Sequence, residues 1–340
     1  MILPVRLGAS SYDIVLERGA LQRAGEYLDL DRRVCIVTDD GVPEAYARTL
    51  AGQCAEAEIA VIPQGEASKS FDFLRLLLGR MLEFGMGRGD CAVAVGGGVV
   101  GDLTGFAAAC YMRGIDFYNV PTTVLSQVDS SIGGKTAIDL NGVKNIVGAF
   151  HQPRGVLIDL DLLQTLPPRQ IANGLAEAVK MALCFDEAGF SLFEGGDPLE
   201  QLDEIVERAL RIKRRVVEED EKEQGLRRAL NFGHTLGHGI ESLFEENGLY
   251  HGECVALGML PMCAPGPRER LRSVLQKLGL PTTCAADPER VMAAVAHDKK
   301  KAVGGVNAVL VESAGACIQK KLTLDKLRER YIAEFGGENA

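Results

Sequence analysis

The first half of the chain alternates short apolar runs with segments of helical periodicity. Apolar runs of strand length, most of them followed by a polar, proline or glycine turn, occupy residues 34–38, 57–62, 91–95, 117–120 and 155–159. Between the second and third of these runs, apolar residues from Phe71 to Phe84 recur at helical spacing. Strands that alternate with helices along a chain predict an α/β fold with a mostly parallel, doubly wound sheet.

The pattern changes after about residue 160. Pro167 and Pro168 open a long stretch that is rich in Leu, Ala, Glu and Arg and has a helical period, with one further candidate strand at residues 303–311. We therefore expect two domains, an α/β domain over residues 1–160 and an all-α domain over residues 161–340. A chain of 340 residues, 46% of them hydrophobic, is long enough to bury a core in each domain.

The charge balance and the cysteines restrict the class of protein. A formal net charge of −10 argues against a surface for nucleic acid or for an acidic membrane, and no apolar run has the length of a membrane span. The nine cysteines include no C-x-x-C pair, and the N-terminus lacks the pattern of a signal peptide. We therefore expect reduced thiols in a cytoplasmic protein whose partners are small molecules.

The turn after the third apolar run is a candidate phosphate-binding turn. It reads Gly96-Gly-Gly-Val-Val-Gly-Asp102 and leads into an apolar, helix-like stretch from Leu103. Glycines let the backbone approach a pyrophosphate, and the N-terminus of a helix offers free N–H groups. Gly96, Gly98 and Gly101 have the G-x-G-x-x-G spacing, but this motif alone is a weak signal for a dinucleotide, so a tight turn that binds nothing is the competing interpretation. Its place at the carboxyl end of a central strand favours ligand binding.

Three of the five histidines, His234, His238 and His251, lie close together in the sequence. The first two share one face of a helix, and a third imidazole from a nearby turn nearly completes a site for a divalent metal ion. Hydrogen-bonded histidines without a metal are the competing interpretation. The metal is favoured because glycines crowd these histidines, and a helical pattern tolerates glycine only for a reason such as close approach of backbone or ligand. These glycines are Gly233, Gly237, Gly239 and Gly252.

Basic and polar residues gather in three glycine-rich or small-residue turns, at residues 113–116, 129–136 and 144–145. Such turns suit phosphate and carboxylate groups, although lysines on turns are usually solvated. Further along, Glu177 and Lys180 are three positions apart on a predicted helix. An exposed ion pair is the simplest interpretation of that spacing.

Six motifs together resemble the 3-dehydroquinate synthase family, in the order in which that family carries them. The motifs are Gly96–Asp102, Pro121–Thr136, Lys144–Phe150, Gly174–Lys180, Asn231–His238 and His251–Glu253. Their joint match is far more specific than any one of them. The resemblance implies a Rossmann-like NAD-binding α/β domain followed by an α-helical metal-binding domain, a fold similar to that of glycerol dehydrogenases, and a homodimer.

The resemblance also implies roles in the chemistry. It implies that a Zn²⁺ or Co²⁺ ion is bound by Glu177, His234 and His251, with His238 handling protons beside it. The implied catalytic residues are Lys135, Lys180, Arg227, His238 and Asn231. The implied substrate-binding residues are Arg113, Asp129, Lys135, Asn145, Lys180, Lys213, Arg227, Asn231, His238 and Lys299, the last being the expected member of a run of three lysines.

The residues implied in NAD⁺ binding come from several turns of the first domain. They are Asp39, Gln64, Gly65, Glu66, Lys69, Gly98, Val99, Val100, Gly101, Asp102, Thr122, Thr123, Lys135, Lys144, Leu162, Leu163, Gln164 and Thr165. One departure from the family pattern is Gly41, which stands where Asn is frequent and affects one expected ribose contact.

The activity implied by the resemblance is the conversion of 3-deoxy-D-arabino-heptulosonate 7-phosphate to 3-dehydroquinate and phosphate, a step of the shikimate pathway of aromatic amino acid biosynthesis. NAD⁺ is recycled in this reaction. Two alternatives stay open: another sugar phosphate cyclase, of the 2-deoxy-scyllo-inosose or epi-valiolone type, and an NAD- and metal-dependent polyol dehydrogenase. Arg227 and Asn231 favour a substrate with a carboxylate, and a neutral polyol needs no such set of basic residues.

Overall fold

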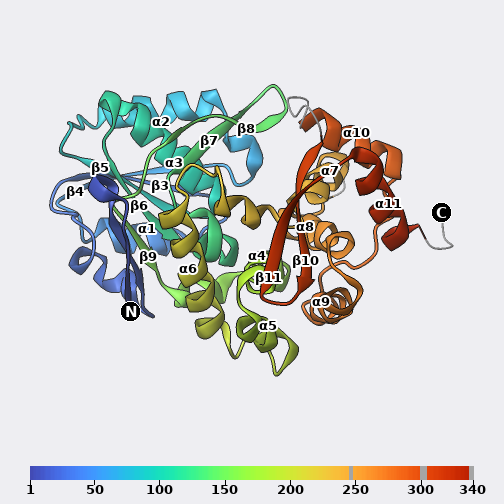
Figure 1. Cartoon of the computed structure of the whole chain (residues 1–340). Coiled ribbons are helices and arrows are strands. Elements are labelled where there is room, and N and C mark those ends of the chain that lie inside the picture. Colours follow the sequence, from blue (N-terminus) through green and yellow to red (C-terminus); the bar gives the residue numbers. More distant parts are fainter. Residues whose placement is uncertain (245–247, 299–304, 337–340) are drawn as a thin grey trace. The chain divides into compact units, whose positions relative to one another are not determined.

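The computed structural model (Figure 1) describes residues 1–244, 248–298 and 305–336 and divides the chain into two compact units, Met1–Pro167 and Pro168–Ala340. The first unit thus continues past residue 160, where we expect the first domain to end. Leu162 explains the difference, because its side chain belongs to a core of the first unit. The carbonyl oxygen of Leu162 also accepts a hydrogen bond from the hydroxyl of Tyr46 at 3.4 Å.

A seven-stranded sheet forms the centre of the first unit. Its strands are β1 (Ile2–Val5), β2 (Tyr12–Leu16), β3 (Arg33–Asp39), β4 (Glu56–Ile62), β5 (Cys91–Gly96), β6 (Asp116–Pro121) and β9 (Gly155–Ile158). They lie in the order β1-β2-β9-β6-β5-β3-β4, and every neighbouring pair is parallel except β1 with β2. All five predicted strands are present, and the N-terminal hairpin β1–β2 adds an antiparallel edge.

Helices cover both faces of this sheet, as a doubly wound fold requires. One core joins α2 and α3 to the sheet through residues such as Leu77 and Leu103. The other joins α1 and η2 to the opposite face through Leu50 and Leu21. The helices and short helical turns of the first unit are α1 (Glu44–Ala51), α2 (Phe71–Glu83), α3 (Gly98–Cys110), η1 (Gly8–Ser10), η2 (Ala20–Glu26), η3 (Glu66–Ser68), η4 (Tyr111–Arg113), η5 (Ser126–Ser130) and η6 (Leu160–Thr165).

A second hairpin of the first unit, β7 (Lys135–Leu140) with β8 (Val143–Phe150), is absent from the sequence prediction. Its turn holds Asn141 and Gly142 at φ +52° and +76°, the left-handed pair that a two-residue hairpin turn favours. Ile138 packs into the core that contains α3, whereas β8 is mostly exposed. The Asn-Gly pair is a signal for this hairpin, but β8 lacks the burial that makes a strand pattern plain.

The second unit is built mainly from helices, as the sequence predicts, with one added hairpin. Strand β10 begins at Val306, within the candidate strand at 303–311, of which residues 303 and 304 lie outside the described part. Gly315, at φ +79°, forms the turn to the unpredicted β11. The elements are α4 (Pro168–Phe185), α5 (Glu187–Glu194), α6 (Leu202–Glu219), η7 (Leu226–Asn231), α7 (His234–Phe244), α8 (His251–Met259), η8 (Leu260–Met262), α9 (Pro265–Lys277), α10 (Pro288–Asp298), β10 (Val306–Ser313), β11 (Ala316–Leu322) and α11 (Leu324–Phe335).

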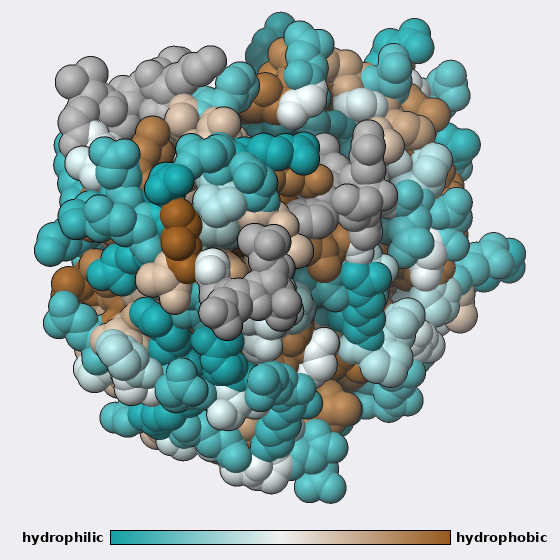
Figure 2. All heavy atoms as spheres, turned by 90° about the vertical axis from the view of Figure 1, so that its right-hand side faces the viewer, coloured by the Kyte–Doolittle hydropathy of each residue, from teal (hydrophilic) through white to brown (hydrophobic). Residues whose placement is uncertain are grey.

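The helices and the surface add little about partners. Among the described residues, no helix is both long and apolar enough to cross a lipid bilayer. On the face drawn in Figure 2, hydrophobic residues lie singly or in small groups among hydrophilic ones. Scattered exposed apolar residues are normal for a protein surface and indicate no particular partner.

Candidate active site

Four segments that carry predicted cofactor residues leave the same edge of the sheet. Strands β3, β4, β5 and β6 are all parallel, and the segments at their carboxyl ends contain Asp39, Gln64, Gly98 and Thr122. Strand β5 lies on the side of β3 opposite to β4, so the order of the strands reverses between β3 and β5. Ligands of open α/β sheets bind at such a switch point. The turn after β3 and the glycine turn after β5 therefore lie where a dinucleotide is expected.

Asp39 shapes the turn after β3. Its carboxylate accepts hydrogen bonds from the backbone N–H groups of Gly41 at 2.9 Å and Val42 at 3.1 Å. Burial raises the pKa of Asp39 above its ordinary value, against the opposing effect of these hydrogen bonds. A β-carbon at position 41 would overlap the side-chain amide of Gln64. The glycine found where the family often has Asn thus leaves room for Gln64.

The glycine turn leads directly into α3, which begins at Gly98. The first N–H groups of a helix have no partner within that helix and favour an anion. A β-carbon at Gly98 would lie 3.1 Å from Ser130 Oγ, and one at Gly97 would lie 3.3 Å from Thr123 Cγ2. The packing of the turn depends on this lack of side chains, and the predicted approach of a phosphate requires it as well.

Lys69 connects three segments that the sequence assigns to cofactor and substrate. Its ammonium group lies 2.9 Å from Asp102 Oδ2 and 3.3 Å from Glu66 Oε1, and it also donates to Asn145 Oδ1. The side chain is 4% exposed, so these oxygens replace the water that a buried charge loses. Burial acts to lower the pKa of Lys69, but the neighbouring carboxylates outweigh it, and the pKa lies above its ordinary value. Lys69 is therefore a charged link between the three segments.

The other predicted residues of the first unit occupy several elements. Thr122 is buried, and its N–H group donates to Gly96 O at 3.0 Å. Residues 162–165 end η6, directly after β9. The predicted substrate residues of this unit are a half-buried Asp129 in η5 and the exposed Arg113, Lys135 and Asn145 in η4, β7 and β8, and the predicted cofactor residue Lys144 is exposed in β8. What these residues bind stays a prediction.

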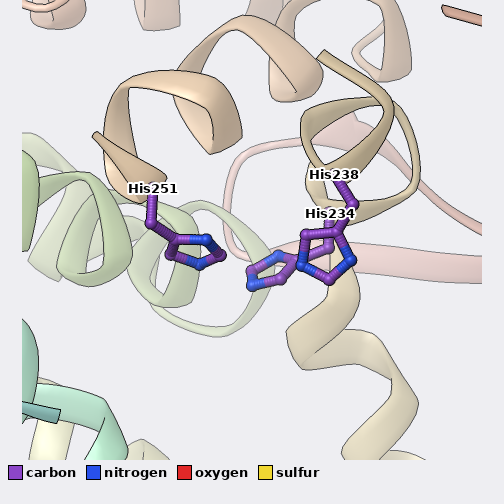
Figure 3. Close-up of side chains that lie close together, drawn as sticks. All are labelled: His234, His238 and His251. Carbon is purple, nitrogen blue, oxygen red and sulfur yellow. The ribbon is translucent and has the colours of Figure 1, made fainter. Parts of the chain in front are cut away.

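In the second unit, the three histidines converge. His234 begins α7, His238 lies one turn further along the same helix, and His251 begins α8. A ring nitrogen of each residue lies within 4.8 Å of those of the other two. Figure 3 shows the His251 ring pointing from its helix toward the two rings of α7. The third histidine thus begins helix α8, whereas the sequence pattern predicted that it comes from a turn.

Glu177 of α4 lies beside this cluster. Its Oε1 atom is 3.6 Å from His234 Nε2 and 3.7 Å from His251 Nε2. The side chain is 1% exposed, and Oε1 has no hydrogen-bond partner among the described residues. Ligands about 2.0–2.1 Å from one tetrahedral ion lie a little more than about 3 Å apart. The three donors therefore fit a divalent ion, which would also satisfy the unpaired carboxylate oxygen.

His234 and His251 each have a hydrogen-bond acceptor beside Nδ1, the ring nitrogen on the side away from Glu177. His234 Nδ1 lies 3.1 Å from Phe232 O, and His251 Nδ1 lies 3.0 Å from Glu241 Oε2. An acceptor at Nδ1 keeps a proton there and leaves the lone pair of Nε2 for a metal ion. Burial, followed by the charge of Lys180, holds the pKa of His234 well below its ordinary value. The ring is therefore neutral near pH 7, as a metal ligand must be.

Glycines bring the helices of the cluster into close backbone contact. A β-carbon at Gly237 of α7 would lie 3.0 Å from Cys254 O of α8, and one at Gly252 of α8 would overlap Asn173 O of α4. The N–H group of Gly252 donates to Asn173 Oδ1 at 2.7 Å. Close backbone approach is thus the reason for glycines beside the histidines, and it fixes the helices that carry the candidate ligands.

Three cationic residues predicted to bind substrate are buried in the second unit. Lys180 is 1% exposed, Arg227 is 4% exposed and Lys213 is 7% exposed. Lys180 pairs with Oε2 of Glu177, so the ion pair that the spacing suggested is buried and not exposed. Arg227 donates to the backbone carbonyl of Glu221 at 2.6 Å. Lysine and arginine side chains are the residues that bind phosphate and carboxylate groups, so these three positions suit the predicted anionic substrate.

The segment between α6 and η7 is folded around Asp220. Its carboxylate accepts hydrogen bonds from three backbone N–H groups, those of Gln224 at 2.8 Å, Gly225 at 2.6 Å and Arg227 at 3.0 Å. The turn η7 that follows carries Arg227 and ends at Asn231. Asp220 therefore fixes the backbone that presents two of the predicted substrate residues.

Two residues that support the site, Glu241 and Asp220, are missing from the sequence prediction. Glu241 lies three positions after His238 on α7, and that spacing is a signal for a carboxylate on the histidine face. Asp220 has no comparable signal, because its role depends on how the following turn folds. The predicted substrate residue Lys299 lies outside the described residues.

The sequence matches known families along most of its length. Residues 59–173 match the N-terminal domain of 3-dehydroquinate synthase, and residues 174–301 match its C-terminal domain. The 3-dehydroquinate synthase of Pelobacter propionicus is 42% identical over 349 residues, which cover 96% of this chain and 97% of that protein. That of Caulobacter vibrioides is 44% identical over 364 residues, which cover 98% of each chain.

Solved structures show the same architecture. A 2-deoxy-scyllo-inosose synthase complexed with carbaglucose-6-phosphate, NAD⁺ and Co²⁺ has a TM-score of 0.87 at 25% identity, over 98% of this chain and 100% of that one. The 2-epi-5-epi-valiolone synthase of Streptomyces hygroscopicus, with NAD⁺ and Zn²⁺ bound, has a TM-score of 0.87 at 28% identity, over 96% and 98%. A probable glycerol dehydrogenase of Sinorhizobium meliloti, at 18% identity and a TM-score of 0.63 over 95% and 96%, shows the fold alone.

The fold, over nearly the whole chain, is similar to that of two sugar phosphate cyclases. The two curated relatives, which are 42% and 44% identical over nearly the whole chain, are both 3-dehydroquinate synthases. The chain belongs to the 3-dehydroquinate synthase family, whose members are enzymes. The resemblance inferred from the six motifs is thereby confirmed.

Proposed function

We propose that this enzyme converts 3-deoxy-D-arabino-heptulosonate 7-phosphate to 3-dehydroquinate and phosphate. The observation that carries the proposal is the approach of one buried oxygen, Glu177 Oε1, to His234 Nε2 at 3.6 Å and His251 Nε2 at 3.7 Å. The buried cations of the same unit add a place for an anionic substrate. The curated relatives, which carry the name of this activity over nearly the full chain, support it.

The two domains divide the binding of the cofactors. The first unit, Met1–Pro167, binds NAD⁺ through the turns at the switch point of the sheet, and the second unit binds a Zn²⁺ or Co²⁺ ion through Glu177, His234 and His251. When bound, NAD⁺ supplies a reversible hydride acceptor, and the ion supplies a Lewis acid that acidifies a substrate hydroxyl group. The solved cyclases with NAD⁺ and Co²⁺ or Zn²⁺ bound support both assignments.

The residues of the chain hold the substrate and move its protons. Lys180, Lys213 and Arg227 bind its phosphate and carboxylate groups. One flexible substrate must stay oriented through oxidation, phosphate elimination, reduction and ring closure, which requires several fixed contacts at once. His238 is exposed beside the two candidate imidazole ligands, where it moves a proton at the substrate. Since the hydride taken first is later returned, the net reaction is that of a carbon–oxygen lyase.

A second candidate function is a different sugar phosphate cyclase activity. It is favoured by the two solved cyclases of the 2-deoxy-scyllo-inosose and 2-epi-5-epi-valiolone type, whose TM-scores are both 0.87. Their substrates lack a carboxylate, so an enzyme of that kind has no use for residues that bind one. Arg227 and Asn231 favour the carboxylate-bearing substrate.

One experiment separates these functions. The purified protein is incubated with Zn²⁺, NAD⁺ and either the heptulosonate phosphate or sugar phosphates that lack a carboxylate, and released phosphate and NADH absorbance are followed together. We expect phosphate release from the heptulosonate alone, with no accumulation of NADH. Release from the other sugar phosphates alone supports the second candidate, and steady formation of NADH without phosphate release supports a polyol dehydrogenase.

We further propose that the enzyme acts in the cytoplasm as a homodimer, on a small sugar acid phosphate and without nucleic acid or membrane partners. The net charge of −10 supports the absence of polyanionic partners. Sedimentation equilibrium tests the dimer, and a mass equal to one chain at micromolar concentration contradicts it.

A further inference from the structure

Helix α7 presents three polar side chains on one face. His234, His238 and Glu241 are spaced by one helical turn each, so they lie above one another along the helix. The first two are part of the histidine cluster, whereas Glu241 has no role in the proposed function. Its side chain is 15% exposed, which is low for a carboxylate. A carboxylate held at this depth requires a partner.

That partner is the candidate metal ligand His251. Glu241 Oε2 lies 3.0 Å from His251 Nδ1, on the side of the ring away from the nitrogen that lies 3.7 Å from Glu177 Oε1. A carboxylate on one nitrogen of an imidazole keeps the proton there, fixes the plane of the ring and makes the other nitrogen a better donor to a metal ion.

The two imidazoles are held in different ways. His234 Nδ1 faces the backbone carbonyl of Phe232 at 3.1 Å, in the segment just before its own helix. His251 is held from a different helix, by a charged side chain. A side-chain substitution can therefore change the support of His251 but not that of His234.

We propose that Glu241 is a positioning residue, which orients His251 and strengthens its bond to the metal ion without touching the ion. The inference rests on the proposed metal site and adds a residue to it. A purely structural role for Glu241, in joining α7 to α8, is the alternative. The two helices are already in backbone contact at Gly237 and Cys254, so their packing does not depend on this hydrogen bond.

The test measures metal binding in three variants. Glu241→Gln keeps the size and an acceptor oxygen but removes the charge, and Glu241→Ala removes both. The control is Ser242→Ala, on the same helix, whose hydroxyl donates to the carbonyl of Gly239 at 3.0 Å. For each protein, Zn²⁺ affinity is measured against a competing chelator, together with the melting temperature of the metal-free form and the absorption spectrum of the Co²⁺ form.

We expect Glu241→Ala to weaken Zn²⁺ binding by about 10–100-fold, with a smaller loss in Glu241→Gln and none in Ser242→Ala. The Co²⁺ spectrum should change in the Glu241 variants, while their metal-free melting temperatures stay close to that of the native chain. Should Glu241→Ala fail to fold, the isosteric Glu241→Gln decides alone.

The proposal is overturned if Glu241→Gln, and Glu241→Ala where it folds, keep the native Zn²⁺ affinity and the native Co²⁺ spectrum. It is also overturned if these variants have a lower metal-free melting temperature but an unchanged metal affinity, because Glu241 then serves only the packing of the helices. Failure of the proposed function gives a different result. In that case the native chain and His234→Ala bind Zn²⁺ equally or not at all, so there is no site at His234, and the inference about Glu241 fails with it.

Discussion

Glu177 Oε1 lies 3.6 Å from His234 Nε2, although the two residues come from different helices of the second unit. The side chain of Glu177 is 1% exposed, and that of His234 is 14% exposed. A buried carboxylate oxygen without a hydrogen-bond partner costs free energy, and a cation shared with the neighbouring imidazoles removes that cost. This pair is therefore the most direct place to test the proposed metal site.

The first prediction concerns removal of the metal. Treatment with EDTA should abolish phosphate release, and added Zn²⁺ or Co²⁺ should restore it, because the proposed Lewis acid acidifies the hydroxyl that is oxidised. Metal content by mass spectrometry and the rate of phosphate release are measured on the same samples. Full activity in a preparation verified to be free of metal contradicts the site.

The second prediction separates His234 from His238. His234→Ala should lose both the bound metal and turnover, because it removes one of three protein ligands. His238→Ala should keep most of its metal and turn over about 10²–10⁴-fold more slowly, as expected when a group that moves protons is lost. Metal content of the two purified variants checks this directly. Loss of metal in His238→Ala with retention in His234→Ala reverses the ligand assignment.

Sequence alone cannot choose between these two histidines. Positions 234 and 238 share one helical face, so their spacing suits a metal ligand equally well at either. The structure brings a ring nitrogen of each to within 4.8 Å of His251, which leaves the choice open. The distances to Glu177 favour His234, and they depend on how α4 packs against α7 and α8, which no local pattern encodes.

Buried strands were easier to predict from the sequence than exposed ones. Strands β3, β5 and β6 are buried along nearly all of their length, so each appears in the sequence as an apolar run. Hairpin β7–β8 was missed because Val143, Ile146 and Phe150 of β8 are exposed, and an exposed strand gives no contrast between its two faces.

The third prediction concerns the glycine turn. Gly98→Val should weaken NAD⁺ binding severely, because a side chain there enters the narrow space at the start of α3, where Ser130 Oγ would lie 3.1 Å from the β-carbon. Gly79→Ala is the control, since its β-carbon in α2 meets nothing within 4 Å, and it should bind NAD⁺ like the native chain. Titration by fluorescence gives the affinities, and circular dichroism shows whether each variant is folded.

A folded Gly98→Val protein with native NAD⁺ affinity means that the glycines of this turn serve only packing. The smaller change Gly98→Ala distinguishes the two roles further. It requires Ser130 to move by only a few tenths of an ångström, so the fold should tolerate it, and any loss of affinity then reports on the cofactor.

The fourth prediction concerns Asp220 and its dependence on pH. Burial acts to raise the pKa of Asp220, but hydrogen bonds from the backbone of Gln224, Gly225 and Arg227 outweigh it, and the pKa lies below its ordinary value. A carboxyl group whose pKa is lower in the folded state stabilises the fold above its unfolded pKa, and this contribution is lost as the pH falls through the folded pKa.

Asp220→Asn should therefore lower the free energy of unfolding at pH 7 by about 0.5–1 kcal/mol, a small effect because water screens a partly exposed group. The difference from the native chain should shrink below about pH 4, where the native carboxyl group becomes protonated while the amide does not titrate. Because Asp220 fixes the backbone of Arg227, the KM for the phosphate substrate should rise while Zn²⁺ affinity stays unchanged. Urea unfolding at both pH values, steady-state kinetics and metal titration measure the three quantities. An unchanged KM at pH 7 means that Arg227 does not need this support to bind substrate.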